Sequence, residues 1–448
     1  MSCLLTGHKK VVDARDKRGH DGGTSKASIA LEDHMGEDHM GANTLTTKCC
    51  IVGGGPAGMM LGYLLARAGV DVVVLEKHAD FLRDFRGDTI HPSTLELMQE
   101  LGLLDAFLRL PHRKVDRLVG EIGDARVTIA EFTRLSTACK FIAFMPQWDF
   151  LDFLADRGRR YAGFHLMMKA EATDLIEQDG RIVGVRANTE VREAEIRADL
   201  VIGADGRHST VRERAGLKVE DLGAPMDVLW TRLSRRPDDH DDVFGRFDAG
   251  RIFIMLNRED YWQCAYVIPK GSADDMMKRD IADFRCMILA TQPWLGERVN
   301  EVKSWDDVKL LTVALDRLPQ WYRPGLLCIG DAAHAMSPIG GVGINLAVQD
   351  AVAAANILTE PLRAGAATPD LLAKVQRRRE WPTRVTQALQ RTIQNRVIRP
   401  VLAGTAQPKP PLVLKLLDWF PALRGIPARF IGIGARPEHI HTKEVAGA

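Results

Sequence analysis

The chain has almost no net charge, few tyrosines and no CxxC cysteine pair, and each shortage counts against a class of protein. The formal net charge is +1 over 448 residues, so we expect no surface that attracts nucleic acid. Seven cysteines are scattered without a CxxC pair. This favours reduced thiols in a cytoplasmic protein and indicates no metal site.

Long apolar runs are also missing. Arg67, Lys415 and Arg424 interrupt the strongest candidates, so none reaches the roughly 18 residues of a transmembrane helix. The N-terminus lacks the apolar core of a signal peptide. With 46% hydrophobic and 27% charged residues, the chain has the composition of a globular protein that is large enough for two domains.

The order of patterns along the chain predicts an α/β protein with a discontinuous first domain. Residues 1–45 mix charges, His and Gly without a period and are predicted to form a disordered extension. From Thr46 an apolar strand, a glycine turn, a helix and a second strand form a βαβ unit. The predicted parts are a nucleotide-binding domain (46–221 and 306–365), a mixed-β substrate domain (222–305), joined by a β segment near 114–145, and a C-terminal helical region (366–448).

The first motif is GGGPAG at residues 53–58, between the strand and the helix of the βαβ unit. Gly53 would allow the tight turn, Gly55 would let backbone N–H groups approach a pyrophosphate, and Gly58 would permit close packing of helix on strand. Glu76 closes the second strand about 20 residues later, where a carboxylate accepts hydrogen bonds from a ribose. A ribose without a 2′-phosphate fits this acid, which suits FAD.

Two further motifs place an aspartate at the end of a strand. In GDAAH (residues 330–334), Asp331 is placed to hold a polyol hydroxyl, and the helix start after SPIGGVGIN (residues 337–345) is placed to face a reduced flavin ring. We favour a packed, satisfied His334 over a catalytic one. In LVIGADGRHSTVR (residues 200–212), Asp205 is expected to fix a turn whose backbone faces phosphate.

In this order the three motifs resemble the group A flavoprotein monooxygenases, the family typified by para-hydroxybenzoate hydroxylase. The resemblance runs from about Thr46 to about Gly365. It implies an FAD-binding Rossmann-like domain, an inserted mixed-β substrate domain and C-terminal helices. In that family the first motif binds the ADP half of FAD, the motif around Asp331 binds ribitol, and the motif around Asp205 serves both FAD and the nicotinamide cofactor. Arg86 resembles the family arginine that meets the pyrophosphate, with a surface salt bridge as the alternative, and Gln147 resembles the glutamine before its helix.

The resemblance also implies a reaction. NADH or NADPH reduces the flavin, dioxygen forms a flavin hydroperoxide, and one oxygen atom passes to a small aromatic or quinoid substrate, with no protein catalytic residue assigned. The expected cofactor-binding residues are Gly53, Gly55, Pro56, Ala57, Gly58, Glu76, Lys77, Arg86, Gln147, Asp205, Gly330, Asp331, Pro338, Gly341, Gly343, Ile344 and Asn345.

The substrate residues are less well defined by the sequence. Trp230, Arg232, Tyr261 and Gln263 are candidates because polar and aromatic side chains alternate with apolar ones there. A core or solvent-facing role is equally favoured for each of them. Arg232 is the candidate partner of a substrate carboxylate. None of the five tyrosines matches the relay that deprotonates a phenol in para-hydroxybenzoate hydroxylase, so a phenol substrate is plausible but has no support from these residues.

Three other functions remain open at this point. A halogenase of the same fold would carry tryptophans where Cys264 and Tyr266 stand in YWQCAYVIP, so it is disfavoured. A flavin-dependent dehydrogenase or reductase is excluded less well, and a redox-sensing, flavin-binding interaction protein comes from another class. The basic amphipathic C-terminal segments favour packing onto the body or a dimer interface over peripheral membrane contact, which leaves a homodimer open.

Overall fold

The computed structural model describes residues 43–82, 89–239, 244–365, 367–404 and 408–445, which form one compact unit. Most of the predicted disordered extension (1–45) lies outside the described residues. Its last residues belong to the first strand, because β1 already begins at Asn43. The predicted domain limits stay predictions.

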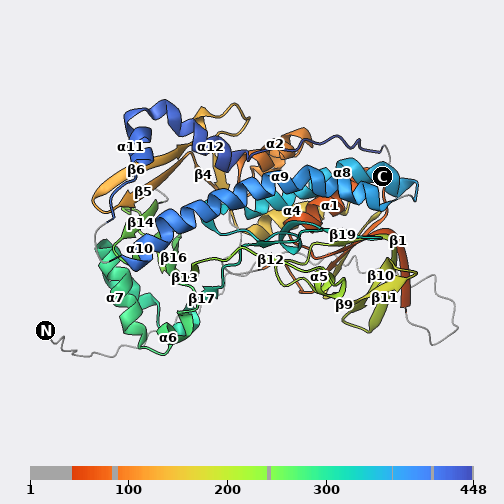
Figure 1. Cartoon of the computed structure of the whole chain (residues 1–448), viewed down its shortest axis with the longest axis horizontal. Coiled ribbons are helices and arrows are strands. Elements are labelled where there is room, and N and C mark those ends of the chain that lie inside the picture. The colour runs from red at the N-terminus through yellow and green to blue at the C-terminus, as the bar shows by residue number, and fades with distance from the viewer. Residues whose placement is uncertain (1–42, 83–88, 240–243, 366, 405–407, 446–448) are drawn as a thin grey trace. The chain divides into compact units, whose positions relative to one another are not determined.

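An eight-stranded sheet carries the three motifs (Figure 1). Its main path runs β19 (Tyr322–Arg323), β20 (Leu326–Cys328), β11 (Glu193–Gly203), β1 (Asn43–Val52), β2 (Val72–Glu76) and β8 (Phe164–Met168). From β20 to β8 the pairs are parallel, so their carboxyl ends share one edge. β2 is buried at every residue, as expected for a parallel strand covered on both faces.

An antiparallel hairpin of β9 (Glu171–Gln178) and β10 (Arg181–Asn188) extends this sheet from β11. Asp179 and Gly180 join the two strands with φ values of 51° and 75°. A type I′ turn requires positive φ at both central residues. The Asp179-Gly180 pair therefore fits a type I′ hairpin turn.

Helices cover the sheet. α1 (Pro56–Arg67) packs against α4 (Gln147–Gly158) and α8 (Gly343–Arg363), and α9 (Pro369–Ile393) packs against α8. The shorter α2 (Pro92–Glu100) packs against α8 and α3 (Leu104–Phe107), whereas α5 (Thr210–Arg214) packs against β9. One apolar run departs from the expectation that no run is long enough for a membrane span: Ile339–Arg363 is long and apolar enough to cross a membrane. In the fold 78% of its most apolar window is buried, because it packs between α1 and α9.

The second large sheet of the fold has seven strands. Its order is β17 (Lys309–Leu311), β13 (Met226–Ser234), β16 (Tyr261–Pro269), β15 (Arg251–Asn257), β14 (Phe244–Asp248), β5 (Arg117–Ile122) and β6 (Ala125–Glu131). The segment near 114–145 therefore shares this sheet with residues of the 222–305 segment. Smaller ladders join β3 (Thr89–Ile90), β7 (Ile142–Phe144) and β4 (Arg113–Val115), and β12 (Glu220–Asp221) with β18 (Asp316–Arg317).

The two faces of the seven-stranded sheet have different neighbours, because successive side chains of a strand point to opposite faces. On one face Trp262, Cys264 and Tyr266 pack with residues of α7 (Ile281–Thr291). On the other face Val228 and Val267 pack with residues that follow the second motif and with the end of α9.

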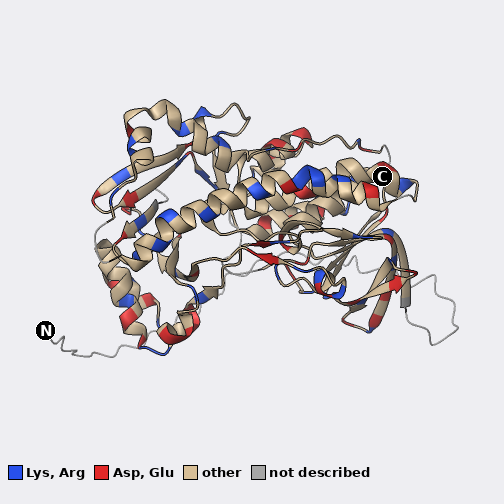
Figure 2. Ribbon diagram, in the orientation of Figure 1, with Lys and Arg blue, Asp and Glu red and all other residues tan. Residues whose placement is uncertain are grey.

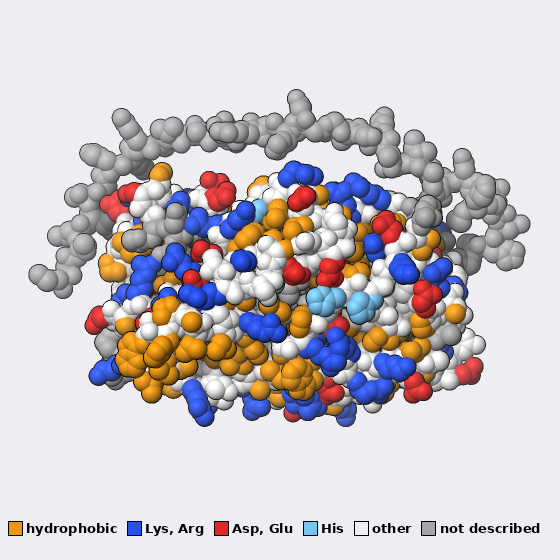
Figure 3. Space-filling view, turned by 90° about the horizontal axis from the view of Figure 1, so that it is seen from above, with side chains coloured by type: hydrophobic (Ala, Val, Ile, Leu, Met, Phe, Trp, Pro, Cys, Tyr) orange, Lys and Arg blue, Asp and Glu red, His pale blue; other side chains and the backbone are white. Residues whose placement is uncertain are grey.

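The C-terminal region is only partly packed. After α9 come a π-helical turn, η6 (Gln394–Ile398), then α10 (Arg399–Ala403), α11 (Leu412–Trp419), η7 (Pro421–Arg424) and α12 (Gly425–Gly432). α12 packs against β6, as the sequence favoured, but hydrophobic side chains gather exposed at the end formed by α11 and its neighbours (Figure 3). They are Leu412, Val413, Leu416, Trp419, Phe420, Leu423 and Ile426.

Cysteines and charges follow the composition. The six described cysteines form no disulfide, and all but Cys286 are buried, which confirms the prediction of unpaired thiols for these six. Residues of both charge signs are interspersed over most elements (Figure 2).

Candidate cofactor and substrate site

The first motif meets the Asp205 loop backbone to backbone at the edge of the parallel sheet. Gly53 follows β1 with φ +109°, and a Cβ on it would lie 2.3 Å from the carbonyl oxygen of Ala204. A Cβ on Gly58 would lie 1.9 Å from the carbonyl oxygen of Gly53. Only glycine fits at both positions, so the turn and the close helix packing predicted for them are observed.

Gly55 differs from these two glycines. It precedes α1 with ordinary extended backbone (φ −76°), and no described atom lies within 4 Å of a Cβ built on it. Among the described residues no side chain caps the N-terminus of α1, and Pro56 and Ala57 begin the helix. The N–H groups of Gly53 and Gly54 are already bonded and Pro56 has none, so the N–H groups available to a ligand are at Gly55 and in the first turn of α1. They stand at the positive end of the helix, which is the arrangement that binds a phosphate.

Glu76 is tied to this turn. It is buried, and one carboxylate oxygen accepts from the backbone N–H of Gly54 at 3.1 Å while the other accepts from His78 at 3.0 Å. A carboxylate has further lone pairs for ribose hydroxyls. The neighbouring Lys77 is exposed, and its ammonium lies 4.0 Å from Glu171; its predicted contact with the cofactor stays a prediction.

Asp205 serves the start of α5. Its two carboxylate oxygens accept from the hydroxyl of Ser209 and, at 3.1 Å, from the backbone N–H of Val211. Burial raises the pKa of Asp205, while the hydrogen bonds from Ser209 and Val211 oppose the rise. Asp205 therefore fixes the turn as predicted, and its contact with a cofactor stays a proposal.

The second motif lies between two helices. A Cβ on Gly330 would lie 3.2 Å from Cβ of Ala57 and 3.3 Å from Cβ of Ala347, so this motif packs against both α1 and α8. Asp331 follows in a 3-10 turn, η4 (Gly330–Ala332), with a guanidinium nitrogen of Arg207 3.9 Å from its carboxylate. Its side chain is half-buried, so its oxygens are accessible to a polyol.

The loop from Pro338 to Gly343 ends at the N-terminus of α8. A Cβ on Gly343 would meet no described atom within 4 Å, whereas one on Gly341 (φ +63°) would lie 2.7 Å from the hydroxyl of Thr89. No acidic residue stands in the first turn of α8. The start of this 21-residue helix is thus a second open N-terminus with positive potential.

Asn345 holds the first turn of α8 to the start of α2, while Ile344 is buried beside it. The amide oxygen of Asn345 accepts from the hydroxyl of Thr94 at 2.7 Å and from the backbone N–H of His91 at 3.3 Å. The ring of His91 is fully buried, with Nδ1 2.8 Å from the carbonyl oxygen of Ile431. This burial lowers the pKa of His91 to about 4, so the ring is neutral near pH 7.

A buried charge network that sequence reasoning missed supports the second motif. Asp350 on α8 lies 2.6 Å from Nε2 of His334, accepts from the backbone N–H of Gly330 at 3.1 Å, and pairs with Arg379 at 3.0 Å. Arg379 also pairs with Glu438 at 3.0 Å. Burial favours the neutral acid, but His334 and Arg379 outweigh it and lower the pKa of Asp350. His334 is therefore packed and bonded, as favoured from the sequence.

The roles predicted for Arg86 and Gln147 stay predictions. Arg86 lies outside the described residues. Gln147 is the first residue of α4 and is half-buried, at a helix that packs against α1.

The four substrate candidates share one face of the seven-stranded sheet. Trp230 stands opposite Ala265, and Arg232 stands opposite Gln263. Trp230 packs against the apolar cluster that also includes Ile339 of the loop before α8, so this face and the loop adjoin. Gln263 is buried, accepts from Arg258 at 3.0 Å, and its Nε2 has no hydrogen-bond partner among the described residues. Arg232 is exposed instead, stacked on the ring of Tyr261 at 4.9 Å.

These features fit FAD. Two helix N-termini stand where a Cβ on the preceding or first glycine would meet nothing. The carboxylates of Glu76, at the end of β2, and of Asp331, after β20, lie at the same edge of the parallel sheet. Cys264 and Tyr266, at the positions where a halogenase would carry tryptophans, point to the opposite face of the sheet from Trp230 and Gln263.

Known proteins support this assignment. The sequence profile of the FAD binding domain family matches residues 46–392. The 6-methylpretetramide 4-monooxygenase of Streptomyces rimosus is 31% identical over 382 residues, which cover 85% of this chain and 91% of that protein.

Solved structures show the same fold. PqsL of Pseudomonas aeruginosa matches with a TM-score of 0.67 at 23% identity, over 80% of this chain and 98% of that one. The myxobacterial chondrochloren halogenase CndH matches with a TM-score of 0.66 at 18% identity, over 85% and 97%. At these identities the likeness extends to the fold alone. The profile match spans most of the sequence, and the chain belongs to the FAD binding domain family, among the group A FAD-dependent monooxygenases.

Proposed function

We propose that this protein uses NADH or NADPH and dioxygen to hydroxylate a small aromatic or quinoid substrate at a bound FAD. The observation that carries the proposal is that the first turns of α1 and α8, which follow the open positions Gly55 and Gly343, both pack against Gly330 beside Asp331, in a chain of this family. A turn that bound nothing would have no need to leave both helix starts open.

The chain's own groups have distinct tasks in this proposal. The N–H groups after Gly55 bind the pyrophosphate, Glu76 holds the ribose, and Asp331 holds a hydroxyl of the ribitol chain. The N-terminus of α8 stabilises the negative charge of the reduced ring. When bound, FAD supplies the electron transfer and the activation of dioxygen, for which the protein contributes orientation and water exclusion.

The substrate would lie between the loop before α8 and the face of β13 and β16. Trp230 offers an aromatic surface there, and Gln263 offers an amide N–H to a substrate oxygen. The relative from S. rimosus is named for 6-methylpretetramide, which supports an organic substrate of small-molecule size. Arg232 would pair with a carboxylate only at the outer end of this face, because it is exposed.

The test follows NADH and NADPH oxidation, dioxygen uptake and peroxide release over a panel of phenols, aromatic acids, quinols and heteroaromatics. We expect one compound to accelerate oxidation, with little free peroxide and a product heavier by one oxygen atom. Arg232→Ala, compared with Arg236→Ala on the same exposed segment, tests the carboxylate pairing. Unchanged affinity in Arg232→Ala for every acceptor would remove it.

The same experiment separates the other functions. Electrons delivered to an organic acceptor without dioxygen uptake would identify a dehydrogenase or reductase. A halogenated product formed with added chloride or bromide would identify a halogenase. Bound FAD without NADH or NADPH oxidation under any compound would favour a redox-sensing interaction protein.

A further inference from the structure

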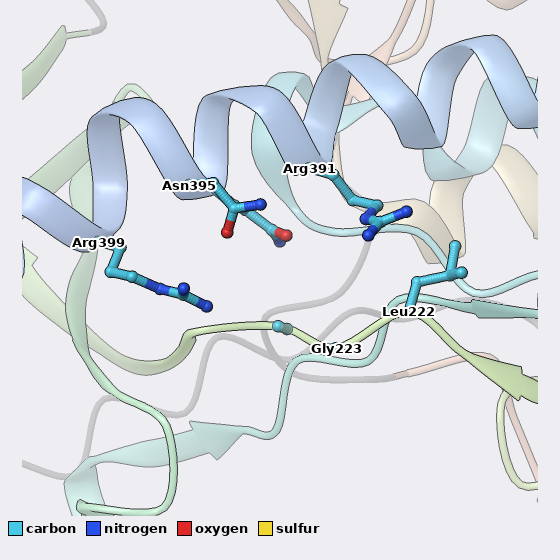
Figure 4. Close-up of a pocket in the computed structure, with 7 residues that line it drawn as sticks. Leu222, Gly223, Arg391, Asn395 and Arg399 are labelled. Atoms are coloured by element: carbon cyan, nitrogen blue, oxygen red, sulfur yellow. The ribbon is translucent and has the colours of Figure 1, made fainter.

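A cavity outside the proposed cofactor site lies where the end of α9 passes the segment between β12 and β13. Its volume is about 250 Å³. Figure 4 shows Arg391, Asn395 and Arg399 projecting from the helix toward the segment at Leu222 and Gly223. The cavity is lined by Leu222, Gly223, Ala224, Arg391, Gln394, Asn395 and Arg399.

The polar side chains of this lining are rich in hydrogen-bond donors. Arg391 and Arg399 donate only, and the amides of Gln394 and Asn395 each offer two N–H groups. No acidic side chain is part of the lining. Within the described residues neither arginine has an ion-pair partner. Arg391 and Arg399 are exposed on the same helical side of the cavity, and two guanidinium groups there without a counter-charge favour a negatively charged occupant.

Gln394 supplies an independent indication of a ligand. Its side chain is 1% exposed, and its Nε2 has no hydrogen-bond partner among the described residues. Buried amide groups almost always have a partner in native proteins, so an orphaned one calls for an explanation. An acceptor in the cavity would satisfy this donor together with the two arginines.

The local helix geometry explains why these residues meet. Residues Gln394–Ile398 form a π-helical turn, and single π-helical turns inside helices are frequently found at functional sites. The wider turn puts Gln394 into the lining beside Asn395, while Ile393 and Ile398 remain packed in the apolar cluster of the sheet.

The cavity is also connected to the loop before α8. Gln390, the residue before Arg391, donates through Nε2 to the carbonyl oxygens of Ser337 at 2.9 Å and Ile339 at 3.0 Å. Its Oε1 accepts from the backbone N–H of Ser337 at 3.1 Å. A change in α9 at the cavity would therefore reach the loop through one residue.

We propose that this cavity binds an oxyanion, the phosphate or carboxylate group of a small molecule, and that its binding is transmitted to the loop of residues 337–343 through α9. The volume is below the about 300–1,000 Å³ of pockets that hold whole drug-sized ligands. It suits a single anionic group or a small organic acid. This site is additional to the proposed monooxygenase reaction and does not depend on its substrate.

The test is isothermal titration calorimetry of the FAD-bound protein with inorganic phosphate and, separately, succinate, at constant ionic strength set by chloride. We expect saturable one-to-one binding of at least one probe. Arg391→Gln combined with Arg399→Gln should weaken it at least about tenfold, as expected for lost charged hydrogen bonds. Arg396→Gln is the matched control, because Arg396 is exposed on the same turn but outside the lining; its affinity should stay within about twofold.

The outcomes divide clearly. Binding of phosphate alone, succinate alone or both supports the site and identifies its anion. No binding of either probe to the wild-type protein, or equal binding by the double variant, overturns it. If circular dichroism shows that the double variant is unfolded, Gln394→Leu replaces it, with the same expected loss. The flavin fluorescence should change on saturation, and an unchanged signal would refute the connection to the loop.

Discussion

Replacing Gly55 by alanine should weaken FAD binding without destabilising the fold. Replacing Gly53 of the same motif should instead destabilise the fold itself. At Gly55 the backbone φ is −76° and no described atom lies within 4 Å of the added Cβ. The free energy of unfolding of the protein without FAD should therefore change by less than about 0.5 kcal/mol. The new methyl group would stand where the pyrophosphate must approach. Loss of one or two charged hydrogen bonds at about 1.5–3 kcal/mol each predicts an FAD affinity at least about tenfold lower.

Gly53 gives the opposite expectation. An alanine there would hold φ +109° and place its Cβ 2.3 Å from the carbonyl oxygen of Ala204. Backbone strain of about 1–3 kcal/mol and an overpacking cost of about 1–3 kcal/mol predict a loss of about 2–6 kcal/mol. Gly180→Ala is the matched control, because Gly180 also has positive φ (+75°) but no described atom near its Cβ. It should show the backbone cost alone, about 1 kcal/mol.

Urea unfolding of the FAD-free proteins measures the free energy of unfolding. Titration with FAD, followed by the change in flavin fluorescence, measures the FAD affinity. An FAD affinity of Gly55→Ala equal to that of the wild type would refute the pyrophosphate site at the start of α1. Equal stabilities of Gly53→Ala and Gly180→Ala would refute the close contact between the first motif and Ala204.

Three further predictions concern burial and surface. Burial lowers the pKa of His91 to about 4 in the folded protein, whereas a histidine in the unfolded chain has a pKa of about 6.5. As the pH drops from about 6.5 to 4, the unfolded chain therefore binds a proton that the folded protein does not, and the free energy of unfolding falls. The loss is about 2 kcal/mol at pH 5. His91→Asn should remove this loss in urea unfolding at pH 7 and 5, and an unchanged pH dependence would contradict the buried, neutral ring. Asp350→Asn should lower the free energy of unfolding by about 3–5 kcal/mol, because it leaves buried cations beside a neutral amide. The control Asp199→Asn breaks the exposed pair with Lys48 and should lower it by less than about 1 kcal/mol. Similar losses for the two variants in urea unfolding would refute the network. Trp419→Ser with Phe420→Ser should keep stability within about 0.5 kcal/mol and reduce self-association in sedimentation velocity, and identical sedimentation would argue against a dimer through α11.

The motifs could be predicted because each one is contiguous. A strand, a glycine turn and a helix are specified by neighbouring residues. The structural roles of Gly53, Gly58 and the Asp205 turn can therefore be predicted without knowledge of any tertiary contact. The alternation of side chains also put Trp230 and Gln263 among the candidates. Their common face depends on the register of β13 against β16, which pairs Arg232 with Gln263, and no local pattern encodes that register.

The buried charges could not be predicted in the same way. Asp350, Arg379 and Glu438 lie far apart along the chain and meet only when α8, α9 and the C-terminal segment pack together. The sequence held one indication of the network, because Asp350 is the only charged residue in the largely apolar run NLAVQDAVAAA. A buried carboxylate needs a cationic or hydrogen-bonding partner, so the run implied a partner without naming it.

α9 shows most clearly why polarity in a sequence does not measure exposure. One face of this helix carries Gln376, Arg379, Thr383, Gln387 and Gln390 at helical spacing, a pattern typical of a solvated face, yet these side chains are buried. Gln376, Gln387 and Gln390 donate to backbone carbonyl oxygens between Asp316 and Ile339. That stretch includes the irregular segments around the second motif, whose peptide groups lack a regular ladder of partners and must be satisfied once buried. α9 therefore needs a polar face where it covers the loops of the proposed flavin site. Apolar residues at these positions would leave those carbonyl groups without donors.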